Sequence, residues 1–363
     1  MQLTDVTLRE GDQMPGRDYS IEEKLTCARA LDDLGVRFIQ PGFPATGEKD
    51  QTVVSTLSGT IDADLVALSR AIERDVDVAV EAGADVVEAF VPASDKQLDH
   101  ILGTSREEML SMLTETVDYI VDRGARPHVT LADAFRTDHD ALAEIFEQIP
   151  RVEFVNLADS VGARTPPTVR TYLDRLGADV DFSRVGVHFH ADMGCGTANA
   201  LAAYEAGVGK ADVSVGSVGE RAGNSSLEEL VVACAVDFDD DLGLETGDLV
   251  PTCRTILETL GEGYDQRKPV LGEKIAEHES GIHTAAMLSD PAALEPYDPG
   301  AFGGRRRLIF GTPTGKSGAR KLLERRGIES DEDTVEAFAD RLATEGPLDL
   351  EDALALAERE FGD

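Results

Sequence analysis

Short apolar segments typical of β-strands alternate with longer amphipathic segments through the first two thirds of the chain. Strand-like segments are predicted at residues 2–8, 36–42, 63–69, 85–92, 126–132, 152–158, 185–191 and 211–219. An amphipathic helix is expected over residues 20–35, because Ser20 is a good helix cap and Gly35 a good helix end. Eight β–α units in roughly 235 residues predict a (β/α)8 TIM barrel, an α/β fold. A doubly wound open sheet is the alternative, although no Gly-x-Gly-x-x-Gly follows the first strand.

The pattern changes after the eighth unit. Residues 237–248 are strongly acidic and read as a linker, and helices are expected further on, around residues 318–327 and 333–346. We therefore predict a catalytic barrel in residues 1–236. Residues 237–363 are predicted to form a linker and a small, mainly helical C-terminal subdomain.

The charge of the chain is extreme. Seventy Asp and Glu residues against 34 Lys and Arg residues give a formal net charge of −36. Such a surface repels nucleic acid and anionic membranes, so neither is an expected partner. Concentrated salt screens this self-repulsion. The composition therefore indicates a halophilic surface adaptation rather than a functional patch.

Cysteine usage and the N-terminal sequence bear on the expected compartment. Cys27, Cys195, Cys234 and Cys253 are widely separated and form no Cys-x-x-Cys pair, which argues against a disulfide framework or a thiolate metal cluster. The first residues do not resemble a signal peptide, and no run of about 18 apolar residues occurs. We expect a soluble, cytoplasmic protein.

Two histidines lie two positions apart at the end of the seventh strand-like segment. Residues i and i+2 of a strand face the same way, so His188 and His190 would point together toward the carboxyl end of a barrel, where barrel active sites form. Closure of the barrel would bring Arg9, Glu10 and Asp12, after the first strand, to the same place. Two imidazoles and the Glu10 carboxylate suit a divalent metal. The alternatives are hydrogen-bonded core histidines and a surface Arg–Glu salt bridge.

A glycine-rich loop follows the eighth strand. Residues 216–226 include Glu220, Arg221 and Asn224, which could face the same pocket. The glycines by themselves are explained equally well by a tight turn.

Four ordered stretches resemble the signatures of a known family, the DRE-TIM metallolyases. The resemblance is closest to the 2-isopropylmalate, homocitrate and citramalate synthases, and it rests on residues 5–16, 188–207, 219–231 and 278–283. It implies a barrel enzyme that condenses acetyl-CoA with a 2-oxo acid and then hydrolyses the thioester. Such an acyltransferase would serve amino-acid biosynthesis, of leucine or lysine for example.

The same resemblance implies a metal centre. Glu10, His188 and His190 would bind a divalent ion (Mg²⁺, Mn²⁺ or Zn²⁺), with Asn224 completing its shell or holding its water. Arg9 would stabilise the negative charge that develops on the keto oxygen of the 2-oxo acid.

It also implies a general base. His283, working with Glu220, would remove a methyl proton from acetyl-CoA, and in the family this histidine is offered by the partner subunit of a homodimer. Gln13 would line the substrate pocket. His278 and His283 could instead be ordinary surface histidines.

The chain departs from the family pattern on the fifth strand. His128, Thr130 and Ala132 stand where homocitrate synthases carry Arg, Ser and Glu, and the loss of that Arg and Glu argues against a dicarboxylic substrate. His128 could still bind a carboxylate, so the 2-oxo acid stays open. Ser160 keeps the hydroxyl of an expected threonine. The residues expected to bind substrate are Gln13, His128, Thr130 and Ser160.

Two other functions are compatible with the sequence. One is an acyl-CoA lyase or aldolase of the same superfamily; such thioester lyases carry a cysteine in the loop after the eighth strand, and residues 212–224 contain none. The other is a non-catalytic metal-binding paralogue, which the fifth-strand losses suggest.

Overall fold

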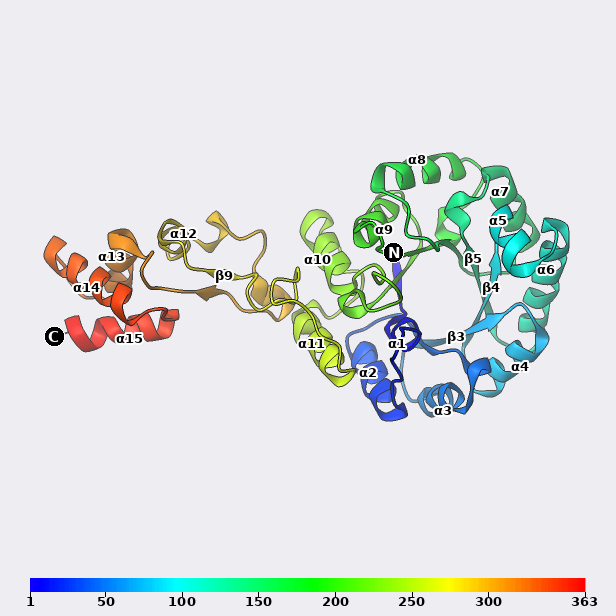
Figure 1. Cartoon of the computed structure of the whole chain (residues 1–363), viewed down its shortest axis with the longest axis horizontal. Helices are drawn as coiled ribbons and strands as arrows, with labels where there is room; N and C mark the ends of the chain where they lie inside the picture. The colour runs from blue at the N-terminus through cyan, green and yellow to red at the C-terminus, as the bar shows by residue number, and fades with distance from the viewer. Residues whose placement is uncertain (363) are drawn as a thin grey trace. The chain divides into compact units, whose positions relative to one another are not determined.

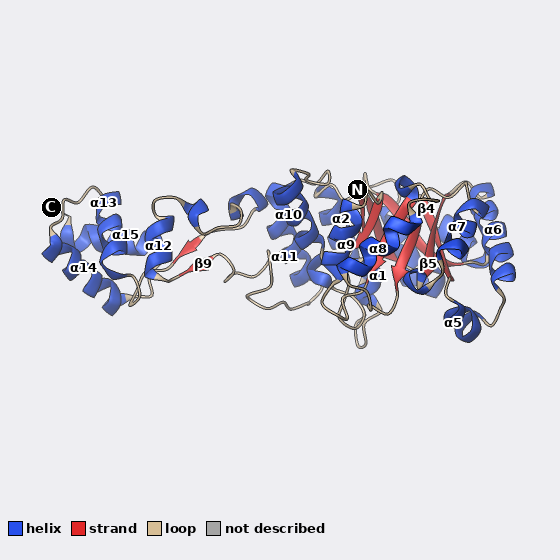
Figure 2. Ribbon diagram, turned by 90° about the horizontal axis from the view of Figure 1, so that it is seen from above, coloured by secondary structure: helices blue, strands red, loops and turns tan. Residues whose placement is uncertain are grey.

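The first compact unit of the chain is a closed parallel barrel. The computed structural model describes residues 1–362, and the chain divides into two units, Met1–Gly263 and the residues from Tyr264 onward. Eight strands pair in sequence order, and β1 also pairs with β8, so the predicted TIM barrel is confirmed and the open-sheet alternative is not. Figures 1 and 2 show these strands surrounded by helices. The strands are β1 Gln2–Asp5, β2 Phe38–Gly42, β3 Asp64–Arg70, β4 Val86–Pro92, β5 Arg126–Ala132, β6 Val155–Asp159, β7 Val185–Phe189 and β8 Lys210–Val213.

Barrel closure depends on the first strand, which is shorter than the sequence predicts. β1 ends at Asp5 because the Asp5 carboxylate accepts hydrogen bonds from the backbone N–H and the hydroxyl of Thr7, both at 2.9 Å. These bonds turn the chain into the short helix α1, Thr7–Asp12. The Thr7 hydroxyl also accepts the backbone N–H of Val215 at 2.8 Å. One side chain therefore ties the end of β1 to the segment after β8.

Helices cover the outer face of the barrel. They are α2 Ile21–Asp33, α3 Glu48–Leu57, α4 Glu73–Glu81, α6 Arg106–Asp122, α7 His139–Gln148, α8 Pro166–Leu176, α9 Gly196–Glu205 and α10 Leu227–Phe238. The short helix α5, Asp95–Gln97, lies in the connection between β4 and α6. The predicted cap of α2 is confirmed: Ser20 and Glu23 form a reciprocal capping box. Apolar side chains fill the space between helices and strands, as where Val76 and Ala79 of α4 pack in one cluster with Val87 of β4. In the described part of the chain, no helix combines the length and apolar character that crossing a bilayer needs.

The acidic segment expected to be a linker is part of the barrel unit. Its Leu244 is buried, and the backbone N–H of Glu245 donates to the carbonyl of Leu34 at 3.0 Å. The next helix, α11 Leu249–Thr259, packs against α2. The unit therefore continues to Gly263, past the boundary expected at residue 236, because this segment has its own buried contacts.

The second unit is mainly helical, as expected. It contains α12 Gly281–Met287, α13 Gly315–Arg325, α14 Glu332–Glu345, α15 Leu350–Phe361 and a two-stranded parallel pair, β9 Glu277–His278 with β10 Arg307–Leu308. Its core includes Phe310, Leu322, Phe338 and Leu356. Helix α15, which also contributes Ala353 and Ala357 to this core, was not predicted from the sequence.

Asp5 makes the stability of the barrel depend on pH. Burial raises the pKa of its carboxyl to about 7, from an ordinary value of 3.8. At a pH between these two pKa values, Asp5 keeps a proton in the folded chain that it releases in the unfolded chain. The Asp5 carboxyl therefore makes folding less favourable as the pH rises. Asp5→Asn should therefore gain stability over the wild type progressively from about pH 4 to about pH 7, by at most about 4 kcal/mol.

Denaturant unfolding in concentrated KCl, followed by circular dichroism across this pH range, measures that difference. Asp33→Asn, which removes an exposed carboxylate of α2, is the matched control. A difference between wild type and Asp5→Asn that stays constant with pH would contradict the role given to Asp5.

Candidate functional site

Three potential metal ligands meet at the carboxyl ends of β1, β7 and β8. Glu10 lies on α1, His188 on β7 and His190 immediately after β7, and one ligand atom from each lies within 4.8 Å of the other two. Oε1 of Glu10 is 3.7 Å from Nε2 of His188. All three side chains are buried. The structure thus brings together the carboxylate and both imidazoles that the sequence singled out.

A neighbouring carboxylate orients His188. Asp212, on β8, has Oδ2 3.1 Å from Nδ1 of His188, so Nδ1 carries the proton and Nε2 is directed toward Glu10. Asn224 contacts the same ring from the loop after β8, with Nδ2 3.1 Å from Nε2 of His188. Its backbone also forms a bridge with His190. The ring of His188 and the backbone of His190 are therefore held in place without a bound ligand.

The charges at this site suit a divalent cation. Burial, reinforced by the nearby His188, lowers the pKa of His190 to about 3 and keeps its imidazole neutral. Burial alone would raise the pKa of Glu10, but Arg9 and the two histidines outweigh it and hold that pKa below its ordinary value. A neutral imidazole and an ionised carboxylate are the forms that bind metal.

Two polar atoms at the site support the same interpretation. Among the residues that the structure describes, Nδ1 of His190 and Oδ1 of Asn224 are buried without a hydrogen-bond partner. Leaving such atoms unpaired is costly unless a ligand satisfies them. The donor set present here therefore fits a divalent metal.

Arg9 stands beside this cluster with its orientation fixed. Its Nε donates to Oε1 of Gln40 at 2.6 Å, and its Nη1 contacts the Glu10 carboxylate and lies 3.3 Å from Oε1 of Gln13. The side chain is 10% exposed. A guanidinium held in this way can stabilise negative charge that develops next to the ligand cluster.

The cluster opens onto a cavity of about 310 Å³ at the carboxyl end of the barrel. The lining residues are Arg9, Glu10, Gln13, Leu68, Glu88, Phe90, Thr130, Ala132, Ala158, Ser160, His188, His190, Asp212 and Glu220. Eight of the predicted site residues are therefore in one place. Asn224 does not line the cavity, but it contacts His188, which does.

His128 lies outside this cavity. Its ring packs edge-on against Phe38 and Phe154, at 5.3 Å from each centroid, and its Nε2 is 3.4 Å from Glu153. It precedes the cavity-lining Thr130 by two positions on β5, so it belongs to the next side-chain layer toward the amino end of the barrel. The structure does not bring His128 to the cavity, because its layer is closer to the amino end of the strand than the layer of Thr130.

The remaining predicted residue, His283, belongs to the second unit. It lies on α12 with its ring exposed, and its centroid is 6.3 Å from that of His278.

Sequence reasoning missed a polar network beneath the cavity. Asn156 donates to Asp212 and to Glu88, both at 3.1 Å, and Nζ of the fully buried Lys210 is 3.3 Å from Asp212 and 3.7 Å from Glu88. Gln40 connects Glu88 back to Arg9. The available signal was Lys210 and Asp212, two charges at i and i+2 on a strand that has no exposed face.

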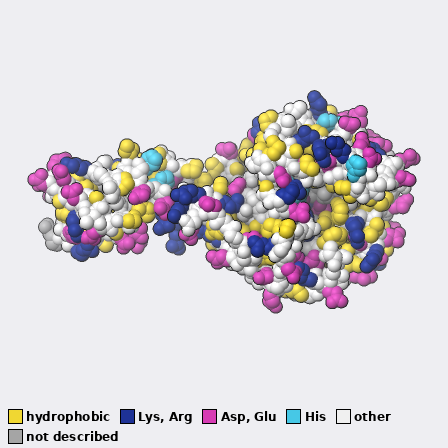
Figure 3. Space-filling view, viewed as in Figure 1, with side chains coloured by type: hydrophobic (Ala, Val, Ile, Leu, Met, Phe, Trp, Pro, Cys, Tyr) yellow, Lys and Arg dark blue, Asp and Glu magenta, His cyan; other side chains and the backbone are white. Residues whose placement is uncertain are grey.

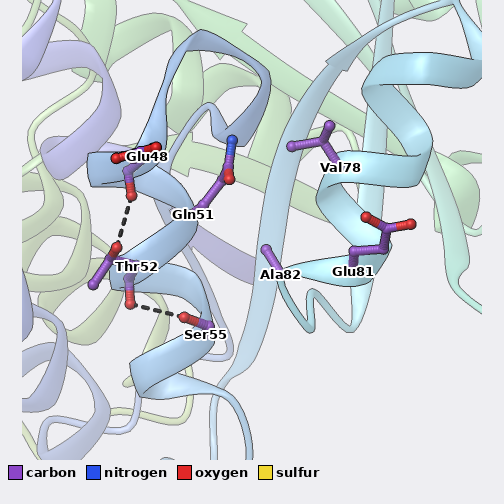
Figure 4. A pocket seen from close by; sticks show the side chains of 7 residues that line it. All are labelled: Glu48, Gln51, Thr52, Ser55, Val78, Glu81 and Ala82. Carbon is purple, nitrogen blue, oxygen red and sulfur yellow. Dashed lines mark hydrogen bonds between the residues drawn. The ribbon is translucent and has the colours of Figure 1, made fainter.

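A second cavity lies outside the barrel. It measures about 380 Å³ and lies between α3 and α4 (Figure 4). Its lining includes Glu48, Gln51 and Glu81 but none of the predicted site residues. We therefore place the candidate site at the barrel mouth.

Comparisons with known proteins show the family to which the chain is related. A family model described as HMGL-like matches residues 1–255, and one described as homocitrate synthase post-HMGL domain-like matches residues 270–346. A probable 2-isopropylmalate synthase of Methanopyrus kandleri is 37% identical over 345 residues, covering 94% of this chain and 69% of that protein. Homocitrate synthase AksA of the same organism is 36% identical over 345 residues, covering 94% and 87%.

Solved structures share the barrel. An HMG-CoA lyase from Bacillus subtilis has a TM-score of 0.64 and 21% sequence identity, covering 74% of this chain and 96% of that chain. At this identity the likeness concerns the fold.

Removing a ligand should remove the metal. We expect His188→Ala and His190→Ala each to weaken Mn²⁺ or Zn²⁺ binding by about 100-fold or more, and Asp212→Asn, which leaves the ligands but alters the orientation of His188, by about 10- to 100-fold. Titration calorimetry on chelator-treated protein measures these affinities. His139→Ala, which removes a ring that packs at a tilt against Tyr172 and does not line the cavity, is the control. Wild-type affinity in His188→Ala would refute the ligand assignment.

Proposed function

We propose that this chain, which belongs to the HMGL-like family, condenses acetyl-CoA with a 2-oxo acid and hydrolyses the resulting thioester. The reaction is that of the 2-isopropylmalate, homocitrate and citramalate synthases, so the enzyme is an acyltransferase of amino-acid biosynthesis. The observation that carries the proposal is the convergence of Glu10, His188 and His190 beside Arg9, at the wall of a cavity of about 310 Å³.

The ligand cluster supports binding of the 2-oxo acid. Glu10, His188 and His190, with Asn224, would hold a divalent ion, which when bound polarises the keto group as a Lewis acid. Arg9 would stabilise the oxyanion that forms as the keto carbon is attacked. Its bonds to Gln40 and Glu10 support this role, because a guanidinium fixed in advance needs no reorganisation as charge develops.

The carbon nucleophile requires a base. We assign this role to His283 of the partner subunit in a homodimer, with Glu220, which lines the cavity and has a 46% exposed side chain. The base removes a methyl proton from acetyl-CoA, and the resulting carbanion forms the new bond to the keto carbon. Water then cleaves the thioester, so acetyl-CoA, 2-oxo acid and water give free CoA and a 2-hydroxy acid that has one carboxylate more than the 2-oxo acid.

The net charge of −36, with Asp and Glu side chains spread over the face seen in Figure 3, further suggests that the enzyme works in concentrated salt, where its carboxylates are screened. Assays should therefore contain concentrated KCl.

Release of free CoA tests the reaction. Purified protein with acetyl-CoA, Mn²⁺ or Mg²⁺ and a panel of 2-oxo acids should release thiol only when metal and a suitable acid are both present. Arg9→Gln should lower kcat by about 10²- to 10³-fold, because it removes stabilisation of the oxyanion. Absence of thiol release with every acid, together with cleavage of a hydroxyacyl-CoA to acetyl-CoA, would favour the lyase instead.

Mixing two inactive variants tests the shared site. His283→Ala lacks the base, and Glu10→Ala lacks a ligand, so a mixed dimer has one site with both defects and one with neither. After subunit exchange verified by mass spectrometry, we expect activity to recover to about one quarter of wild type when exchange is random and complete. A mixture that stays inactive would show that His283 does not act across subunits.

A further inference from the structure

We infer that the cavity takes a monocarboxylic 2-oxo acid with a short uncharged side chain, and that Glu88 excludes acids that carry a second carboxylate. The inference rests on the proposed function, and it assigns the substrate class and a specificity-determining residue.

The cavity has a closed end and an open end. Glu88 and Asp212, at the closed end, are each 2% exposed, whereas Gln13 and Glu220 are accessible to solvent. Acetyl-CoA carries a nucleotide and a long pantetheine arm, far more than about 310 Å³ can contain, so it must reach the ligand cluster from the open end. The side chain of the 2-oxo acid therefore lies at the closed end.

The walls of the cavity include an apolar surface. Leu68 is buried at the end of β3, Phe90 lies on β4, Ala132 on β5 and Ala158 on β6. These side chains suit a short aliphatic group, because burying its apolar surface against them is favourable. Ala132 in particular leaves room without offering a polar contact.

Glu88 has the hydrogen bonds of an ionised carboxylate. Thr130 and Asn156 donate to Oε1, and Gln40 donates to Oε2 at 3.4 Å. Lys210 lies 3.7 Å from Oε2 but is nearer to Asp212 and does not line the cavity. Glu88 therefore presents negative charge at the closed end.

A second substrate carboxylate would find no partner there. Among the described lining residues, the one Lys or Arg side chain is Arg9, which is already bonded to Glu10 and Gln40. A distal carboxylate would lose its hydration and face the charge of Glu88, and both effects oppose binding. Like charges placed together in this way are an effective means of rejecting a wrong ligand.

Selectivity of the wild type is the first test. With the CoA-release assay, kcat/KM for pyruvate, 2-oxobutyrate or 2-oxoisovalerate should exceed that for 2-oxoglutarate and 2-oxoadipate by about 100-fold or more. Calorimetry of the metal-loaded protein without acetyl-CoA should show the same order of binding. This second readout does not depend on turnover.

Glu88→Gln tests the residue, since it keeps the size and most hydrogen bonds of Glu88 but removes the charge. It should narrow the selectivity for monocarboxylic over dicarboxylic acids by about tenfold or more, mainly through a lower KM for the dicarboxylic acid. Glu153→Gln is the matched control, because Glu153 contacts His128 and Arg126 outside the cavity. It should leave the selectivity unchanged.

The outcomes separate this inference from the proposed function. CoA release with 2-oxoglutarate at a rate similar to that with 2-oxoisovalerate would overturn the inference and leave the synthase function standing. Absence of release with every acid would overturn the function, and the binding order would still decide the inference. If Glu88→Gln folds and its selectivity is unchanged, Glu88 does not determine the selectivity. If that variant does not fold, wild-type selectivity alone decides the substrate class.

Discussion

Parallel pairing of β1 with β8 is the contact on which the site depends. Thr4 pairs with Asp212 and Asp5 with Val213, so the first and last strands of the barrel lie side by side. Glu10 follows β1, Asn224 follows β8, and the two histidines are on and just after β7, next to β8. Residues from opposite ends of the barrel sequence therefore share one cluster. The carboxyl ends of neighbouring parallel strands coincide, which is why barrel active sites form there.

The interior of this barrel is unusually polar near that cluster. Where many barrels fill the space with branched apolar side chains, Asn156, Asp212, Glu88 and Lys210 form a connected network. Buried charges are costly unless paired and hydrogen-bonded, so a network that includes two carboxylates and an ammonium restricts the orientation of each member. The network also fixes the orientation of His188, because its member Asp212 accepts the hydrogen bond from the ring N–H of His188. Glu88, which rejects a second substrate carboxylate, and Asp212, which orients the metal ligand His188, thus belong to the same polar network.

The strands and the two histidine ligands could be predicted from the sequence, because each shows a short local pattern. Seven strands were predicted to within three residues at each end, whereas β8 ends at Val213, six residues before its predicted end. His188 and His190 were recognised by their spacing of two. Other features depended on contacts distant in sequence. The turn after β1 is tied to Val215 through the Thr7 hydroxyl, and the acidic segment after α10 is held by the carbonyl of Leu34. His128 shares the inward face of β5 with Thr130 but belongs to another layer, and a period of two cannot distinguish layers.

The double role of the Thr7 hydroxyl has a consequence for biogenesis. It donates to Asp5 and accepts from Val215, so one anchor of the helix that carries Glu10 forms only when the last strand has docked. During vectorial synthesis Glu10 leaves the ribosome long before the two histidines, and a nascent chain cannot assemble the three ligands. Binding of a metal by all three residues would therefore follow closure of the barrel.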